Sequence, residues 1–333
     1  NLKGRKVEAQ TLSSLLWNGT NLSIEALAKY ERIILDEFSM LPPYEMGLLL
    51  NAHLKFGLKV ICVGDQNQCK APVNNWVRYD NNPLFVKMCG CYIVTMTYKP
   101  GFARYDEALY AALVSFLKDR TLADLTCSEV ESYQNICFSN DKRRQLNKAC
   151  LARWVKEHSA TLKDFGFPVC VGLPVMAYDD ADKDLGIFKT QKWIVKSIEK
   201  AKIYLTRDGK EVYLDKAQFK AIFNYAFCMT THKCQGVTIY GHYNIYEAER
   251  MSADVLYTAM SRGTKREYVH IVSKKSGRYY ESSRADSVLV PHEPIKMRTG
   301  RIYRINLSDG SVYIGKTIKT LEERFEEHKK NPT

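Results

Sequence analysis

Two adjacent carboxylates, Asp36 and Glu37, directly follow the apolar run of residues 32–35. At the end of a strand, such a pair could hold Mg²⁺ through the first carboxylate and orient an attacking water with the second. The pair alone is a weak signal, since many strands end in acidic residues. Residues 64–68 (Gly-Asp-Gln-Asn-Gln) strengthen it, because they follow the next apolar run. From there, Gln68 could sense a terminal phosphate held at the neighbouring strand end.

Two further segments carry groups suited to phosphoryl transfer. They are residues 230–236 (Thr-Thr-His-Lys-Cys-Gln-Gly) and residues 257–262 (Tyr-Thr-Ala-Met-Ser-Arg). Arg262 could place a fixed, positively charged fork on a phosphoryl group. Taken singly, Arg262 is more often a surface ion-pair partner, and His232 a core or capping residue. The joint order and spacing of all four segments argues against coincidence.

These groups need strands that end at one edge of a sheet. Residues 32–35 and 59–63 are predicted strands, and residues 42–50, with two prolines at the start, a helix between them. This spacing predicts parallel strands joined by a right-handed crossover. Both strands are almost continuously apolar, which predicts a sheet covered on both faces. Ligands bind at the carboxyl ends of such strands, so the acidic clusters form one candidate site.

The rest of the sequence alternates between α/β-type segments and an antiparallel β-type segment. A third apolar run covers residues 91–97, and helices are predicted over residues 106–118 and from residues 139–140 to about 158. Between residues 167 and 223, short β-type runs separated by turn signals predict a small antiparallel barrel inserted in an α/β frame. The α/β style returns over residues 227–273, and Pro291 and Pro294 mark a linker.

Together, the four segments resemble the motifs of a superfamily 1 helicase of the RecD-like branch, over about residues 1–275. The acidic pair resembles motif II, residues 64–68 motif III, residues 230–236 motif V and residues 257–262 motif VI. The resemblance implies ATP and Mg²⁺ as cofactors, with Mg²⁺ near Asp36. It implies that Glu37 orients the attacking water, that Gln68 senses the terminal phosphate and that Arg262 is an arginine finger.

The resemblance also assigns binding residues by position. The implied nucleotide contacts are Gly64, Asp65, Arg104, Lys233, Gln235 and Gly236. Lys99 competes with Arg104 for the motif IV position. The implied DNA contacts are Thr11, Thr231 and His232. These assignments imply a monomeric motor on single-stranded or forked DNA that moves 5′→3′, with protein partners left open.

A motor of this kind needs a loop that cradles phosphates upstream of Asp36, and none matches there. We therefore expect the given chain to be a fragment that starts inside motif Ia. Residues 310–317 do match the pattern G-x-x-x-x-G-K-T. However, Val312, Tyr313 and Ile314 are stiff strand formers, and Asp309-Gly310 is a hairpin turn signal. A capping box at residues 320–323 also places the helix start too late for a phosphate loop.

The same C-terminal residues resemble the start of a GIY-YIG nuclease. The matching residues are Tyr303, Tyr313, Arg324 and His328, and the last two lie four apart on one helix face. The resemblance implies a site where water attacks a phosphodiester, with the family's metal-binding glutamate expected beyond Thr333. A generic ββα unit with surface charges is the alternative for this segment.

Composition limits the classes of protein to which the chain can belong. The chain has 333 residues with 49 Lys+Arg and 37 Asp+Glu, a formal charge of +12, which fits either a solvated face or a polyanionic partner. No apolar stretch of 18 residues and no apolar signal core occur, so we expect no membrane span or secretion. We expect an intracellular protein of the cytoplasm or nucleus, whose ten cysteines are reduced and mostly buried.

The expected fold class is α/β, with two RecA-like parallel-sheet domains. The first domain covers residues 1–95, and the second covers residues 96–160 and 225–285. A barrel occupies residues 161–224, a linker residues 286–299, and a partial nuclease domain residues 300–333. The expected function is an ATP-dependent DNA helicase fused to an endonuclease. A nucleic-acid-binding chain without ATPase activity, or a nuclease with a degenerate motor, stays open.

Overall fold

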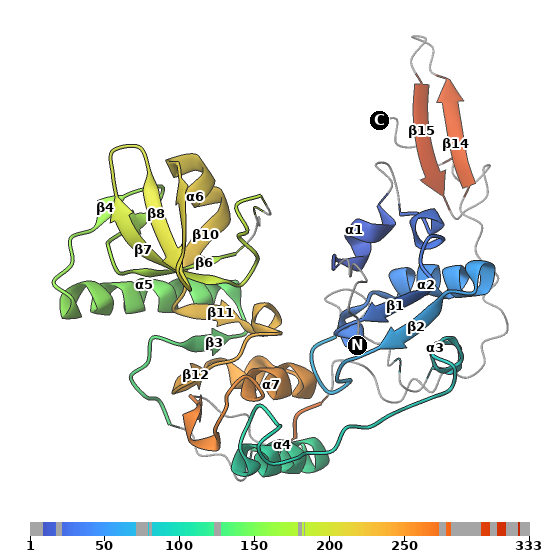
Figure 1. Cartoon of the computed structure of the whole chain (residues 1–333), viewed down its shortest axis with the longest axis horizontal. Coiled ribbons are helices and arrows are strands. Elements are labelled where there is room, and N and C mark those ends of the chain that lie inside the picture. Colours follow the sequence, from blue (N-terminus) through green and yellow to red (C-terminus); the bar gives the residue numbers. More distant parts are fainter. Residues whose placement is uncertain are drawn as a thin grey trace. The chain divides into compact units, whose positions relative to one another are not determined.

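The computed structural model describes residues 9–17, 22–70, 79, 82–122, 128–178, 182, 184–272, 278–280, 301–306, 312–317 and 326. They divide into two compact units, Asn1–Arg284 and Ala285–Thr333. The first unit contains two parallel sheets, a five-stranded antiparallel sheet and a two-stranded antiparallel sheet, and the second contains a hairpin (Figure 1). None of the described helices is long and apolar enough to cross a membrane.

The first parallel sheet pairs β1 (Arg32–Leu35) with β2 (Lys59–Cys62). Helix α2 (Pro43–Phe56) joins them, as the sequence predicts. It begins where two prolines favour a first turn and ends at Gly57, whose φ of 69° suits only glycine well. Its apolar side packs against the sheet in a core that also includes α3 (Pro83–Met88). The other elements of this region are α1 (Leu12–Leu16), η1 (Glu25–Leu27) and η2 (Phe38–Met40).

The expectation that this sheet is covered on both faces is wrong for the described residues. Ile34 is 69% exposed and Ile61 is 45% exposed, because the described helices cover only the opposite face. The third apolar run also forms no strand, and its side chains from Tyr92 to Val94 are exposed. Apolar composition predicts burial only when another element is present to supply the covering surface.

The second parallel sheet has the order β11 (Cys228–Thr230), β3 (Asn135–Cys137), β12 (Tyr243–Ile245), β13 (Val269–Ile271). Helices α4 (Glu107–Asp119) and α7 (Ala253–Met260) pack with Ile136 on one face. Helix α5 (Asn140–Glu157) contacts β3 and β11 on the side of Cys137 (Figure 1). The predicted helices at 106–118 and 139–158 are thus confirmed, and Asp106 and Ser139 cap their first turns.

The inserted segment is an antiparallel sheet of order β10 (Phe223–Tyr225), β6 (Pro174–Ala177), β7 (Lys192–Ile198), β8 (Ile203–Arg207), β9 (Lys210–Leu214). Trp193 is buried in its core, which α6 (Lys216–Ile222) and the short β4 (Lys163–Asp164) and β5 (Pro168–Val169) adjoin. The predicted antiparallel pairing is confirmed. Among the described strands the order is open, so closure into a barrel stays a prediction.

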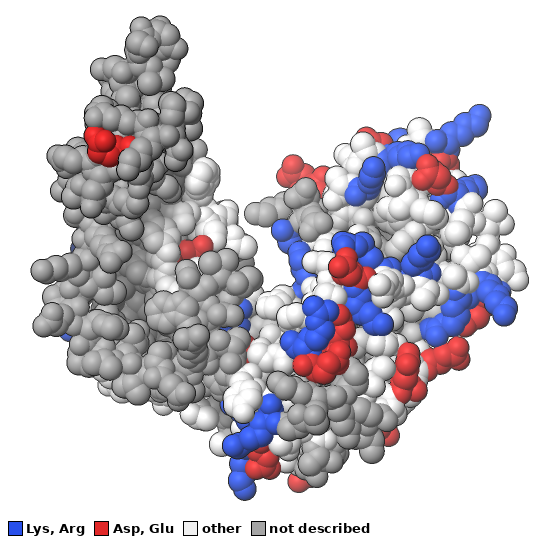
Figure 2. Space-filling model, turned by 180° about the vertical axis from the view of Figure 1, so that it is seen from behind, with Lys and Arg blue, Asp and Glu red and all other residues white. Residues whose placement is uncertain are grey.

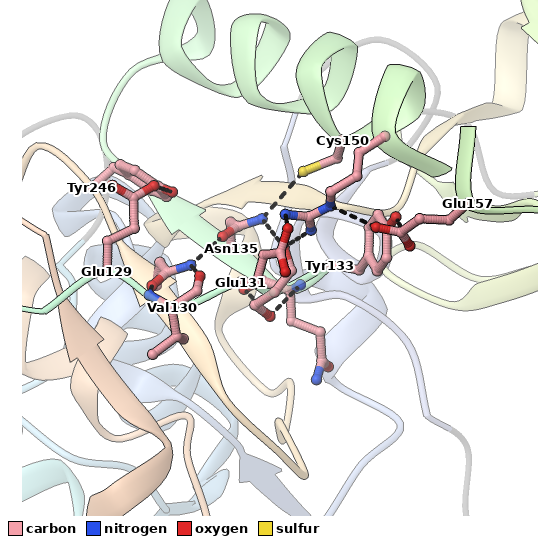
Figure 3. Close-up of polar contacts among 12 residues, drawn as sticks. Glu129, Val130, Glu131, Tyr133, Asn135, Cys150, Glu157 and Tyr246 are labelled. Carbon is pink, nitrogen blue, oxygen red and sulfur yellow. Dashed lines mark hydrogen bonds and ion pairs between the residues drawn. The ribbon is translucent and has the colours of Figure 1, made fainter. Parts of the chain in front are cut away.

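A polar network holds the segment before β3 in place (Figure 3). Asn244 exchanges two hydrogen bonds with the backbone of Val130, at 3.0 and 2.8 Å. The hydroxyl of Tyr133 donates to Glu157 at the end of α5, at 2.5 Å. Because Asn244 is buried and these partners come from β12 and α5, the network fixes the sheet and the helix to each other.

Short 3₁₀ turns adjoin the strands of the second sheet, and the first of them carries part of a predicted motif. They are η3 (Thr231–Cys234), η4 (Ala248–Arg250) and η5 (Arg266–Tyr268). Residues 257–262 lie on α7 and the turn that follows it, so this motif also sits at the end of a secondary-structure element.

The second unit contains β14 (Arg301–Asn306) and β15 (Val312–Thr317), paired antiparallel. The register pairs Ile302 with Lys316 and Arg301 with Thr317. Lys316 and Thr317, the last two residues of the pattern that resembles a phosphate loop, therefore lie in a strand. This confirms the predicted hairpin and excludes the phosphate loop. Arg324 and His328 lie outside the described residues. For Tyr303 and Tyr313 only the backbone is described.

Candidate active site

The acidic pair lies where β1 ends. Asp36 is exposed, and its Oδ1 accepts a hydrogen bond from the backbone N–H of Glu37 at 2.9 Å. Glu37 has a left-handed backbone (φ 52°, ψ 44°), which is strained for a residue with a side chain and turns the chain into η2. Its Oε2 is buried and has no hydrogen-bond partner. The strained turn therefore directs an unsatisfied carboxylate oxygen into the site.

The pKa of Glu37 depends on its burial and on the charges around it. Burial and the negative charge of Asp36 raise the pKa of Glu37 above its usual value of 4.5. The positive charges of Arg262 and Arg104 act in the opposite direction. Residues that are more than 200 positions apart in the sequence thus share one electrostatic environment. A carboxyl group with a raised pKa is better suited to accept a proton near neutral pH.

The loop after β2 connects the two parallel sheets. Asp65 accepts hydrogen bonds from the backbone of Asn67 at 2.8 Å and from the hydroxyl of Tyr257 at 2.9 Å. The backbone N–H of Cys69 donates to the hydroxyl of Thr258, at 2.8 Å. Since Tyr257 and Thr258 belong to α7, the strand end of one sheet is held against a helix of the other.

Arg262 is only 1% exposed and is held by defined partners. Its Nε donates to the carbonyl of Thr258 at 2.9 Å, and its Nη2 donates to Ser261 Oγ at 2.8 Å. The same Nη2 reaches Gln68 Oε1 at 3.2 Å. The guanidinium is therefore fixed at the boundary of the two sheets, next to the glutamine that the sequence singles out.

A second arginine lies close by. Arg104 Nη2 donates to the carbonyl of Ser261 at 2.5 Å. Partial burial and the nearby charge of Arg262 lower the pKa of Arg104. Lys99, the competing assignment, is exposed, with its ammonium 4.6 Å from the ring centre of Phe102. The geometry thus favours Arg104 over Lys99.

Residues 230–236 divide between the core and the surface. Gln235 Nε2 lies 3.5 Å from the carbonyl of Cys69, and its Oε1 is buried without a partner. Lys233 instead reaches the antiparallel sheet, with its Nζ 3.1 Å from the carbonyl of Tyr178 and 4.7 Å from that ring's centre. His232 is exposed. Gly236 ends the segment with a φ of 74°.

The structure corrects the expectation for Thr231 as a DNA contact. Its side chain is 0% exposed, and its hydroxyl donates to the carbonyl of Cys137 at 3.4 Å. The residue lies at the start of η3, directly after a buried strand, which explains its burial. Thr11 caps α1 by accepting from the backbone of Ser14 at 3.3 Å, and no described contact connects it to the residues above.

Several buried polar atoms of this region fit a polar ligand. Both side-chain atoms of Gln66 lack partners, as do Glu37 Oε2 and Gln235 Oε1. The guanidinium groups of Arg104 and Arg262 and the Nε2 of Gln66 can donate to the terminal phosphate of a nucleotide, whereas the acceptor oxygens of Glu37 and Gln235 suit a water molecule. The described residues contain no cluster of three metal-ligating side chains. Asp36 is the exposed carboxylate here that could hold Mg²⁺ together with phosphate oxygens and water, as this ion commonly binds.

Glycine is required at position 64 because the side chain of Phe38 approaches it closely. A Cβ there would lie 2.9 Å from Phe38 Cδ1, and φ at Gly64 is 155°. We expect Gly64→Ala to lower the free energy of unfolding by about 1–3 kcal/mol, because Phe38 must move. Urea unfolding measures this change. Gly47→Ala in α2 is the control, since no atom lies within 4 Å of its Cβ, and it should stabilise by about 0.5–1 kcal/mol. Equal stability of Gly64→Ala and the parent would contradict the prediction.

Sequence reasoning did not single out four contributors to this region. Tyr257 and Thr258 were inside a recognised motif, but their contacts with Asp65 and Cys69 depend on how α7 faces the first sheet. Gln66 was likewise inside a motif without an assigned role. Tyr178 had no sequence signal, because it meets Lys233 only through the placement of the inserted sheet.

No protein-family model matches the chain, and no curated protein matches it. Among solved structures, the fold is similar to that of Pif1 helicases. The chain is similar to the Pif1 helicase from Bacteroides in complex with ADP-AlF3 and single-stranded DNA, with 21% identity, 79% of each chain covered and a TM-score of 0.56.

Two further Pif1 structures agree. One, of two coordinating Pif1 helicases at forked double-stranded DNA, has 17% identity, a TM-score of 0.52 and coverage of 79% of this chain and 78% of that one. The Pif1 helicase from Candida albicans has 13% identity, a TM-score of 0.50 and coverage of 75% and 74%. At these identities the likeness establishes the fold, which agrees with the expected α/β class.

Proposed function

We propose that the chain is the motor region of an ATP-dependent DNA helicase of the RecD-like branch, acting on single-stranded or forked DNA. The observation that carries this proposal is the 3.2 Å contact between Arg262 and Gln68, which joins the two parallel sheets beside Glu37. The solved structures with this fold include Pif1 helicases bound to single-stranded DNA and to ADP-AlF3.

In this proposal each polar group has a task in phosphoryl transfer. Glu37 accepts a proton from the attacking water, and Gln68 orients that water against the terminal phosphate. Arg262 and Arg104 stabilise the negative charge that develops on the phosphoryl oxygens. Mg²⁺, when bound through Asp36, neutralises phosphate charge. Gly64, Asp65, Gln235 and Gly236 shape the two loops around this point.

The same geometry suggests how hydrolysis would drive movement. Arg262 and Tyr257 come from the second sheet's elements, while Gln68 and Asp65 come from the first. When hydrolysis removes the terminal phosphate, Arg262 loses that contact, and the packing between the two sheets changes as a result. Alternating grip on the strand by the two halves would then give steps, for which we propose the 5′→3′ direction.

The proposed DNA contacts are His232, Lys233 and, from the first region, Thr11. Arg143 Cζ lies 4.3 Å from the ring centre of Tyr178, on which Lys233 also rests. On the face that Figure 2 shows, Lys and Arg alternate with Asp and Glu over the described residues. Charge on that face is mixed, so affinity would depend on such local contacts more than on a general basic surface.

Binding to single-stranded DNA is expected to weaken steeply with salt, with a log–log slope of about −0.7 for each phosphate contact. Lys233→Ala should make the slope shallower by about 0.7 if its ammonium contacts a phosphate. Lys55→Ala, at an exposed ion pair with Glu25, is the control and should leave the slope unchanged. Fluorescence anisotropy at several salt concentrations measures both. A salt-independent affinity would contradict the prediction.

The decisive test of the function is strand-stimulated ATP hydrolysis by the complete protein, followed by unwinding of duplexes with a 5′ or a 3′ single-stranded tail. The proposal expects hydrolysis that depends on DNA, and unwinding of the 5′-tailed substrate. DNA binding without hydrolysis would favour a non-enzymatic binding protein instead. Preference for the 3′-tailed substrate would reject the proposed direction.

We also propose that residues 300–333 begin a GIY-YIG endonuclease domain that uses Tyr303, Tyr313, Arg324 and His328. The support is the antiparallel hairpin, in which Tyr303 pairs with Gly315. The complete protein should cleave DNA in the presence of Mg²⁺, and His328→Ala should abolish cleavage while preserving ATP hydrolysis. Cleavage by the variant at the parent's rate would leave only a ββα unit with surface charges.

A further inference from the structure

We propose that Cys62 and Cys89 form a reversible disulfide under oxidising conditions, joining the end of β2 to the end of α3. Cys62 is the last residue of β2, and Cys89 directly follows α3. Their Sγ atoms lie 3.7 Å apart, within hydrogen-bonding distance for two thiols. Closing this gap to a bonded sulfur pair of about 2.05 Å requires each sulfur to move by only about 0.8 Å.

The pair is reactive as well as close. The hydrogen bond between the two thiols lowers the pKa of Cys89 and raises the pKa of Cys62. Cys89 is therefore the favoured thiolate, which is the nucleophile in thiol–disulfide exchange. Both residues are half-buried at the edge of the first core, so a small reagent has access to them. Proximity, a favoured thiolate and partial exposure therefore coincide at this pair.

Another cysteine pair in the chain lacks the second and the third of these properties. Cys137 and Cys228 lie even closer, with their Sγ atoms 3.5 Å apart. Both are buried between the second sheet and α5, and burial raises the pKa of Cys228 well above its usual value. Distance alone would favour this buried pair, whereas access to both sulfurs and the lowered pKa of Cys89 favour the pair of Cys62 and Cys89. Cys137 and Cys228 therefore serve as an internal control for the effect of distance alone.

The reaction needs an external oxidant, for which we name a low-molecular-weight disulfide such as oxidised glutathione. The Cys89 thiolate attacks one sulfur of the reagent, which breaks the reagent's S–S bond and releases one thiolate. Cys62 then loses its proton and attacks Cys89 Sγ, which releases the second thiolate. Two protein thiols are oxidised and one small disulfide is reduced to two thiols.

The position of the bond gives it a consequence for the candidate active site. Cys62 lies two residues before Gly64, where the loop that holds Asp65 and Gln68 begins. On the α3 side, Phe85 stacks on Phe38 with ring centres 5.2 Å apart, and Phe38 adjoins Glu37. A disulfide would fix α3 against both segments. The inference concerns bond formation and stands apart from the proposed motor function.

The test oxidises the full-length native chain with oxidised glutathione, alkylates the remaining thiols after unfolding, and maps the peptides by mass spectrometry. The expected product is one peptide pair cross-linked through Cys62 and Cys89, with Cys137 and Cys228 alkylated. A second expected result is a rise in the thermal unfolding midpoint that dithiothreitol reverses and that Cys62→Ser lacks. Cys91→Ser, at an exposed neighbour, should still form the cross-link.

Three outcomes would overturn the proposal. They are full alkylation of Cys62 and Cys89, a cross-link confined to the buried pair, and a mixed disulfide at Cys91 alone. Because the peptide map requires neither ATP nor DNA, its result is independent of whether the chain is a helicase. Hydrolysis measured before and after oxidation then shows whether the bond changes the motor.

Discussion

Replacement of Glu37 by Gln in the complete protein is expected to slow DNA-stimulated ATP hydrolysis by about 10²–10⁴-fold, the usual contribution of a general base. The amide keeps the size of the side chain but cannot accept the proton of the attacking water. Binding of single-stranded DNA should change little, because no described contact of Glu37 points to nucleic acid. Steady-state phosphate release and strand binding, measured on the same preparation, test the two halves of the prediction.

The control for this substitution is Glu31→Gln, an exposed carboxylate on the same segment that pairs only weakly with Arg32 and Lys59. It should hydrolyse ATP at the parent's rate. The pH profile gives an independent check. Because burial raises the pKa of Glu37, the parent's activity should fall with decreasing pH through a value above 4.5, and the Gln variant should lack that limb. Equal rates for Glu37→Gln and the parent would reject the assigned role.

Replacement of Arg262 by Ala is expected to lower the hydrolysis rate by about 10³–10⁵-fold, the range for loss of an arginine finger. The guanidinium lies between the two sheets and is the fixed positive charge nearest Gln68. Its loss also removes bonds to Thr258 and Ser261, so thermal unfolding must be measured in parallel. Arg262→Lys retains the charge without the planar fork, and it should remain folded but slow.

Arg144→Ala supplies the matched control for a lost arginine, since Arg144 is exposed on α5 and pairs only with Asp141. It should retain the parent's rate and stability. Gln68→Ala should weaken the coupling between the sheets and slow hydrolysis less than Arg262→Ala does. A folded Arg262→Ala variant with the parent's ATPase rate would exclude Arg262 from the reaction and remove the main support for the motor.

Much of the local structure was predictable from short-range signals. The strand, helix and strand around Asp36 follow from apolar runs and from the prolines that begin α2. Helices α4 and α5 start at side chains that cap them, Asp106 and Ser139. The hairpin of β14 and β15 follows from stiff strand formers, which is why a matching phosphate-loop pattern could be rejected. Each of these features depends on neighbours within a few residues.

Which side chains are exposed and which are buried was less predictable from the sequence. Ile34 was expected in a sheet covered on both faces, yet its side chain is exposed, as are those of the apolar run after Cys91. Thr231 was expected at the DNA, yet it is buried at the start of η3. Burial depends on what packs against a residue, and apolar or polar character alone does not supply that information.

By itself the sequence determined the inventory of chemical groups and the ends of the elements that bear them, because these depend on residue type and local spacing. Only the tertiary structure decided that Arg262 faces Gln68, that Arg104 rather than Lys99 lies beside it, and that Lys233 turns to Tyr178. Those contacts span many positions along the chain. They are set by how two sheets and an inserted sheet pack together, since the free energy of packing depends on the whole core rather than on any one segment.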